Sequence, residues 1–178
     1  MEKKLQSANI GTAGEHLVLA HLLRLNFVAG LAPYNTKDYD LIVVNKDGST
    51  SCPIQVKTSM NKDGWMMSHK HEKPIDNLFY CFVQMYRTKP DTEIFVIDSK
   101  TVAHVVKMAH QIWLKIPGRK GKAHNQTSMR ILGRDNRIAV GKTKNYAEFL
   151  NKAEIEFLEK YKIGWLEQYR DAWSLLKQ

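Results

Sequence analysis

Residues 38–44 read Asp-Tyr-Asp-Leu-Ile-Val-Val, and residues 54–59 read Ile-Gln-Val-Lys-Thr-Ser. The apolar run that starts at Asp40 is typical of a short strand over 40–44, and the second stretch predicts another strand over 54–57. An Asp-Gly pair at 47–48 lies between them and is a strong hairpin signal. The sequence therefore predicts an antiparallel hairpin, and the rest of the fold is built outward from it.

The register of this hairpin brings polar side chains together. A turn centred on the Asp-Gly pair puts Asp40 directly across from Gln55, and Asp38 across from Lys57. Gln55 and Lys57 also share one face of their strand, because side chains two residues apart point the same way. A slip of one residue would move Asp40 to the opposite face, so the cluster depends on this register.

A helix is expected over about residues 7–25 and carries a further acidic side chain. Glu15 lies on or beside the apolar stripe that contains Val18, Leu19 and Leu22. Burying a carboxylate without a partner is costly, so a metal ion or another cation is expected near Glu15.

These residue types point to metal-assisted chemistry. Glu15, Asp40 and Gln55 offer oxygen ligands, which suit Mg²⁺ or Mn²⁺ better than zinc. Such an ion polarises a phosphodiester and lowers the pKa of a bound water, and Lys57 can orient that water or stabilise charge on the phosphate. In the plainer alternative, Lys57 forms a salt bridge with Asp38 or Asp40, and Gln55 is a polar residue on an exposed face. The spacing alone leaves both interpretations open.

The charge of the chain indicates a polyanionic partner. The 178 residues carry a net charge of +9, and residues 115–144 account for +8 of it with nine basic residues and one acid, Asp135. Glycines punctuate this basic segment, so loops that follow a phosphate backbone are expected, with a merely solvated loop as the alternative. The candidate DNA contacts are Lys115, Arg119, Lys120, Lys122, Arg130, Arg134 and Arg137.

The remaining pattern predicts an α/β fold with a central mixed β-sheet flanked by helices and a C-terminal helical extension. Two further strands are expected over 78–86 and 93–97, and Ser99 is expected to cap a helix that ends near 114. All 178 residues are assigned to one domain, which consists of a core over about 7–114, the basic segment 115–144 and C-terminal helices over 146–176.

Composition and motifs narrow the classes of function. The chain is 43% hydrophobic and 25% charged, which excludes disordered and coiled-coil classes. No apolar run approaches the roughly 20 residues of a membrane-spanning helix, and the N-terminus lacks a signal-peptide core. With only Cys52 and Cys81, a reducing, cytoplasmic location is expected. No glycine-rich nucleotide loop or acyl-transfer nucleophile motif is present, so no nucleotide cofactor is expected.

Two other groups of residues have weaker functional interpretations. His69 and His71 form an H-x-H pair, but no second pair lies at zinc-site spacing, so a loop near DNA is favoured over a zinc site. Core or interface packing, rather than base stacking, is the interpretation for Trp65, Met66, Met67 and Trp113.

At Gly14-Glu15, residues 38–43 and residues 54–59, the sequence resembles the PD-(D/E)xK nuclease superfamily. The resemblance is to its archaeal Holliday junction resolvases and its small bacterial, phage and intron-associated endonucleases, and it covers about residues 10–60. It implies a restriction-endonuclease-like core in which Asp40 is the central metal ligand, Lys57 the catalytic lysine and Glu15 the helix glutamate. Gln55 stands where most members carry Asp or Glu; its amide oxygen can still coordinate a metal, but one negative charge is lost.

The sequence thus predicts a metal-dependent DNA endonuclease that uses Mg²⁺, with Mn²⁺ as a substitute, and whose site residues are Glu15, Asp40, Gln55 and Lys57. A homodimer is expected, since two symmetric sites are the simplest way to cut both strands. The alternative from another class is a non-catalytic DNA-binding module that retains the nuclease fold, suggested by Gln55 and the basic segment. An RNA-directed nuclease fits the charge equally well, although no aromatic RNA-recognition motif favours it.

Overall fold

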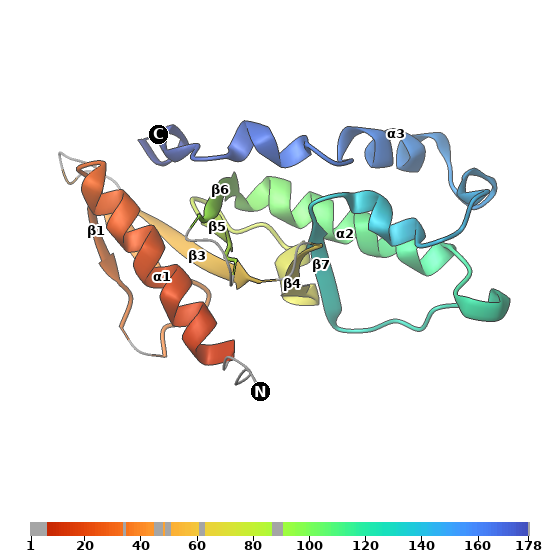
Figure 1. Cartoon of the computed structure of the whole chain (residues 1–178), viewed down its shortest axis with the longest axis horizontal. Coiled ribbons are helices and arrows are strands. Elements are labelled where there is room, and N and C mark those ends of the chain that lie inside the picture. The colour runs from red at the N-terminus through yellow and green to blue at the C-terminus, as the bar shows by residue number, and fades with distance from the viewer. Residues whose placement is uncertain are drawn as a thin grey trace. The chain divides into compact units, whose positions relative to one another are not determined.

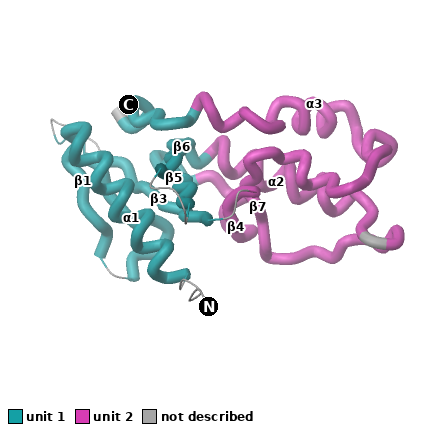
Figure 2. The backbone as a smooth tube through the Cα atoms, in the orientation of Figure 1, with its two compact units in different colours: residues 1–61, 75–99, 169–178 teal, residues 62–74, 100–168 magenta. Residues whose placement is uncertain are grey.

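A computed structural model describes residues 7–33, 35–44, 48, 51–60, 63–86 and 91–177, and only the backbone of Arg119 and Lys177. The chain forms two compact units (Figure 2). Unit 1 comprises residues 1–61, 75–99 and 169–178, and unit 2 comprises residues 62–74 and 100–168. The assignment of the whole chain to one domain stays a prediction.

Unit 1 is a five-stranded mixed sheet with one long helix. The strand order is β1-β2-β3-β5-β6; β3 and β5 run parallel, and the other neighbours run antiparallel. The predicted α/β class with a central mixed sheet is therefore confirmed. The elements, shown in Figure 1, are α1 (Ser7–Arg24), β1 (Val28–Leu31), β2 (Leu41–Val44), β3 (Ser51–Ser59), β5 (Phe79–Gln84), β6 (Glu93–Asp98) and the 3₁₀ helix η6 (Trp173–Lys177).

The predicted register of the β2–β3 hairpin is confirmed. The ladder pairs Leu41 with Ile54 and continues to the far end of β2 in the same register. The ladder ends at the Leu41–Ile54 pair, and the N–H of Asp40 donates to the carbonyl of Ile54, so Asp40 lies next to the position opposite Gln55 without pairing with it in the ladder. Asp47 at the centre of the turn lies outside the described residues.

Asp38 departs from the prediction that it lies across from Lys57. It is in a bend before β2, with a φ of +73°. This left-handed conformation takes the chain out of the strand, so the ladder does not extend back to Asp38.

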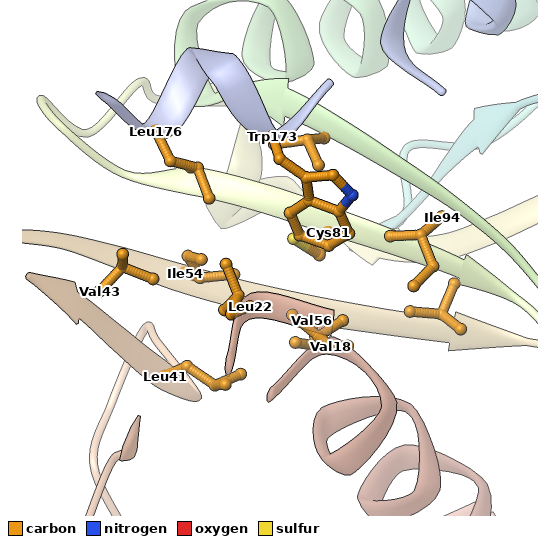
Figure 3. Packing of buried hydrophobic residues seen from close by; sticks show 12 residues of the cluster. Val18, Leu22, Leu41, Val43, Ile54, Val56, Cys81, Ile94, Trp173 and Leu176 are labelled. Carbon is orange, nitrogen blue, oxygen red and sulfur yellow. The ribbon is translucent and has the colours of Figure 1, made fainter. Parts of the chain in front are cut away.

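One face of the sheet packs against α1 because its side chains are apolar and alternate along each strand. Figure 3 shows Val18 and Leu22 of α1 against Ile54 and Val56 of β3, with Trp173 of η6 in the same cluster. Val18, Leu22 and Ile54 are completely buried. Each such side chain contributes about 1.5–3 kcal/mol of hydrophobic stabilisation.

The helix comes closest to the sheet at Gly14. A Cβ added there would lie 1.8 Å from the Oγ1 of Thr58 on β3. Only a residue without a side chain fits at this position, so Gly14 sets how closely α1 can approach β3.

Unit 2 contains a second, two-stranded antiparallel sheet, in which β4 pairs with β7. The apolar side predicted for its long helix is confirmed, since Val102, Val105 and Val106 are completely buried. The elements that lie wholly or mainly in unit 2 are β4 (Gly64–Ser68), η1 (His69–Glu72), α2 (Ser99–Lys115), η2 (Arg119–Gly121), β7 (Met129–Gly133), η3 (Asn136–Val140), η4 (Tyr146–Phe149), α3 (Lys152–Lys160) and η5 (Trp165–Tyr169).

Two sequence-based expectations are corrected in unit 2 and at the C-terminus. The basic segment contains the strand β7, where only loops were expected, because β7 finds its hydrogen-bonding partner in β4, some 60 residues earlier in the chain. The stretch 146–176 is α-helical only over Lys152–Lys160 and otherwise forms 3₁₀ turns. Asn151 caps α3 by accepting the N–H of Glu154, and Gly164, with a φ of +92°, lies in the turn that follows α3.

No helix among the described residues is long and apolar enough to cross a membrane.

The two glycines of α1 provide a matched test of the close approach to β3. Gly14→Ala is expected to lower the free energy of unfolding by about 1–3 kcal/mol, because the new methyl group overlaps the Thr58 hydroxyl. Gly11→Ala is the control: a Cβ there meets nothing within 4 Å, so better helix propensity should raise the free energy of unfolding by about 0.5–1 kcal/mol. Urea unfolding of both variants measures the difference, and equal effects would contradict the close approach.

Candidate active site

The predicted site residues gather where β2 separates from β3. The ladder between these strands ends at Leu41 and Ile54, whereas β3 continues to Ser59 along β5. The second half of β3 therefore extends past the beginning of β2. A backbone N–H on that edge needs an acceptor other than a β2 carbonyl.

Asp40 supplies this acceptor and is fixed by three hydrogen bonds. Its N–H donates to the carbonyl of Ile54 at 2.8 Å, and its own carbonyl accepts the N–H of Ala32 at 2.8 Å. Its Oδ2 accepts the N–H of Val56 at 2.7 Å. The carboxylate thus replaces a strand carbonyl at the fork, and because a carboxylate has about four acceptor positions, it keeps capacity for a cation.

Gln55 and Lys57 lie on β3 directly after the fork. The neighbouring Ile54 and Val56 belong to the core that packs against α1, so Gln55 and Lys57 occupy the other face of the strand. Gln55 is only 7% exposed, and Lys57 is half-buried. The predicted separation of the two faces is therefore confirmed.

Glu15 joins this group from α1. Burial raises the pKa of its carboxyl, and the negative charge of Asp40 raises it further. His16 and Lys57 act in the opposite direction. The charges of Asp40 and Lys57 both act on Glu15, so the two carboxylates and the lysine that the sequence singled out lie within electrostatic range of one another.

Tyr80 was not anticipated from the sequence. It pairs with Gln55 in the parallel β3–β5 ladder and is 2% exposed. Burial, aided by the negative charge of Asp38, raises the pKa of Tyr80 to about 12, so its hydroxyl stays neutral. No local pattern could identify Tyr80, because the pairing joins residues 25 apart across other elements.

Glu15 and Asp40 offer carboxylate oxygens, and Gln55, on the face of β3 away from α1, offers an amide oxygen. Their donor set has two carboxylates and one amide, and among the described residues no three His, Cys, Asp or Glu side chains form a metal-binding group. Carboxylate and carbonyl oxygens are the ligands that Mg²⁺ and Mn²⁺ prefer. The pKa of Glu15 is raised mainly by burial and further by the negative charge of Asp40, and a bound cation would act against both effects.

The two histidines of the H-x-H pair, His69 and His71, lie in the 3₁₀ helix η1 that follows β4. His71 is buried, and its Nδ1 accepts the N–H of Ser68 at 3.0 Å. His69 is exposed at the start of the same 3₁₀ helix.

Several residues of the basic segment have carboxylate partners in unit 2. The Nζ of Lys115 lies 2.6 Å from Oε1 of Glu154, and Nη2 of Arg137 lies 2.6 Å from Oδ2 of Asp135. Arg130 pairs with Glu72 and is 4% exposed, so it is a buried structural residue.

The pKa values of these carboxylates reflect the pairing. Burial alone would raise the pKa of Glu154, but hydrogen bonds from Lys115 and from the N–H of Asn151 hold it below its usual value. The hydrogen bonds from Arg137 likewise lower the pKa of Asp135. These charges are used to hold unit 2 together.

Other cations of the segment lie on the surface of unit 2. Lys120 and Lys122 are exposed, and the side chain of Arg119 lies outside the described residues. Arg134 is half-buried and lines a hollow of about 610 Å³ together with Lys142 and Lys144. The structure thus gives carboxylate partners to Lys115, Arg130 and Arg137, and places Lys120 and Lys122 on the surface.

The raised pKa of Glu15 has a measurable consequence for stability. The pKa of Glu15 in the folded state lies above its unfolded value of 4.5. At pH values between these two pKa values the folded state binds more protons than the unfolded state, so the free energy of unfolding falls as the pH rises through this range. In EDTA at pH 7, Glu15→Gln is therefore expected to raise the melting temperature, and the gain should vanish below pH 4.5. Added Mg²⁺ should stabilise the wild type more than the variant.

The control for this measurement is Glu156→Gln, which changes a carboxylate with a 66% exposed side chain on α3. It should show no such pH-dependent gain. A Glu15→Gln variant less stable than the wild type at pH 7 in EDTA would contradict the electrostatic account.

Comparisons with known proteins agree with the fold. No family model matches the chain, and none of the curated proteins matches it. Among solved structures, the chain is similar to a bacterial homing endonuclease, I-Ssp6803I, with a TM-score of 0.50 and 14% sequence identity over 97% of this chain and 92% of that one. The chain therefore has an α/β, nuclease-like fold.

Proposed function

We propose that this protein is a Mg²⁺-dependent DNA endonuclease of the PD-(D/E)xK type. The observation that carries the proposal is the gathering of Glu15, Asp40 and Lys57 at the β2–β3 fork. The likeness in fold to a homing endonuclease supports a nuclease. The surface cations of unit 2 support a nucleic-acid substrate.

The site residues have two separate roles in the proposed hydrolysis of a phosphodiester, namely holding the cation and positioning the water or the phosphate. Asp40, Glu15 and the amide oxygen of Gln55 would hold the cation, which would supply Lewis acidity and lower the pKa of a bound water. Hydrolysis forms a bond from the water oxygen to phosphorus and breaks one ester bond, whose oxygen takes up a proton. The Lys57 ammonium has three N–H donors with which to orient the water or stabilise the charge on the phosphate.

Gln55 motivates the alternative of a non-catalytic DNA-binding module. Its neutral amide leaves the site with two carboxylates, which is expected to weaken metal affinity and to favour one cation over two. A cleavage assay separates the two functions.

The structure also refines which cations are proposed to contact DNA. The exposed Lys120 and Lys122 are favoured, whereas Lys115, Arg130 and Arg137 have carboxylate partners within unit 2. The homodimer and the cytoplasmic location stay predictions.

Plasmid nicking tests the catalytic assignment. Asp40→Asn keeps an oxygen acceptor for the Val56 N–H but removes the charge, and Lys57→Met removes the ammonium. Each variant is expected to slow Mg²⁺-dependent cutting about 100-fold or more, and EDTA should abolish cutting by the wild type. Asp91→Asn, at an exposed aspartate between β5 and β6, is the matched control and should cut normally.

Two results would overturn the catalytic assignment. Undiminished cutting by Asp40→Asn would place the active site elsewhere. If the wild type binds DNA in a salt-sensitive way but cuts neither plasmid nor branched DNA in Mg²⁺ or Mn²⁺, the protein is a binding module.

Salt dependence tests the proposed phosphate contacts separately. The double substitution Lys120→Gln, Lys122→Gln is expected to reduce the slope of log affinity against log salt by about 2, since each phosphate contact contributes about 0.9. Lys107→Gln, Lys152→Gln changes the charge equally at exposed positions outside the basic segment and should leave the slope unchanged. Fluorescence anisotropy of a labelled duplex measures both slopes, and equal slopes would refute these contacts.

A further inference from the structure

The two-stranded sheet of unit 2 has one apolar face that is open to solvent. Met66 of β4 is 73% exposed, and its partner in the ladder, Ile131 of β7, is 38% exposed. Met129, opposite Ser68, adds a third large apolar side chain with 48% exposure. This outer face consists of Met66 and Ser68 of β4 and Met129 and Ile131 of β7, which alternate along the ladder with the buried Trp65, Met67, Arg130 and Leu132. Figure 1 shows the two strands side by side.

Cationic residues follow the ends of both strands. Lys70 is exposed shortly after β4. Arg134 follows β7, and the hollow of about 610 Å³ beside it is lined by Arg134, Arg137, Lys142 and Lys144 together with Asp63 and Asp135, so its basic residues outnumber its acidic ones. The outer face itself carries no acidic residue, and the exposed Asp63 lies just before β4.

A second copy of the chain suits this face poorly. Strands of five residues are about 17 Å long, so a face roughly 10 Å wide offers about 170 Å². A stable protein interface buries about 800 Å² per partner. Two copies meeting here would also bring like charges together, because both carry the basic segment.

Duplex DNA suits this face better. A two-stranded β-ribbon fits the major groove of B-form DNA, which is about 12 Å wide. With the ribbon in the groove, the basic residues beyond the ends of the strands would lie near the phosphates that flank the groove. Their positive charge is complementary to the negative charge of the phosphates. The major groove of A-form RNA is too narrow and deep to admit such a ribbon.

We propose that the outer face of the β4–β7 ribbon enters the major groove of duplex DNA and reads the methyl groups of thymine. The inference rests on the proposed function in taking DNA as the substrate, and it adds which residues select the sequence. In the major groove the C5-methyl group of thymine is the apolar feature of the base-pair edges, and the other features are hydrogen-bond donors and acceptors. A face formed by Met66, Met129 and Ile131 can therefore discriminate mainly by contact with thymine methyl groups.

A binding selection followed by methyl removal tests this assignment. The full chain carrying Asp40→Asn selects duplexes from a library with a randomised centre, in EDTA, so that cleavage plays no part. Thymines in the enriched duplex are then replaced one at a time by deoxyuridine, which removes only the methyl group. At one or more positions the replacement is expected to weaken binding about three- to tenfold.

The ribbon variants assign this loss to particular side chains. With Met66→Ser or Ile131→Thr added, the thymine and deoxyuridine duplexes are expected to bind equally well, while the salt dependence stays the same. Ile163→Ser is the matched control, since Ile163 is 64% exposed in unit 2 but lies outside the ribbon, and it should keep the full discrimination. Melting temperatures and light scattering on all variants establish that fold and oligomeric state are unchanged.

Several outcomes would overturn the proposal. Discrimination against deoxyuridine that persists unchanged in both ribbon variants would remove these residues from readout, as would DNA binding without any enriched sequence. A change of oligomeric state in the ribbon variants would assign the face to a second copy. Each of these results leaves plasmid cutting by the wild type intact, whereas a protein that neither binds nor cuts DNA would also overturn the proposed function.

Discussion

The hydrogen bond from the Val56 N–H to the Asp40 carboxylate is the constraint on which the site depends. Where β2 ends, β3 would otherwise present a backbone donor without a strand carbonyl, and the Asp40 side chain fills that place. The same carboxylate lies close enough to Glu15 to raise its pKa. One side chain therefore completes the sheet and supplies a charge of the site.

This local origin explains what could be predicted from the sequence. Asp40 and Gln55 are joined by one short hairpin, so the position of its turn sets their register, and alternation sets the face of Lys57. Tyr80 could not be found in this way, because it reaches Gln55 through a parallel pairing of β3 with β5. The β4–β7 ribbon was missed for the same reason, since its strands are about 60 residues apart and neither is recognisable without its partner. Asp38 was misplaced because alternation cannot anticipate a left-handed φ immediately before a strand.

The net charge of the basic segment, residues 115–144, overstates how many of its cations are available on the surface. Its sequence gives a charge of +8, but two of the carboxylates that pair with its cations, Glu72 and Glu154, lie outside residues 115–144. Their partners Lys115 and Arg130 are thus engaged within unit 2, and Arg130 is buried as well. The charge available to a polyanion is smaller than the sum and is carried by exposed residues such as Lys120 and Lys122. Burial and pairing, which depend on distant parts of the chain, decide which cations can meet a phosphate.

The same electrostatic reasoning gives Gln55 a physical role. Glu15 already has a raised pKa because it is partly buried beside Asp40. A third carboxylate at position 55, which is only 7% exposed, would add repulsion and favour protonation of Glu15 further. A neutral amide contributes an oxygen donor without adding that repulsion. Mg²⁺ commonly binds one or two carboxylates and completes its shell with water and substrate phosphates. Under the proposed function, two carboxylates and an amide would therefore suffice for a cation whose coordination is completed by water and by the DNA phosphate.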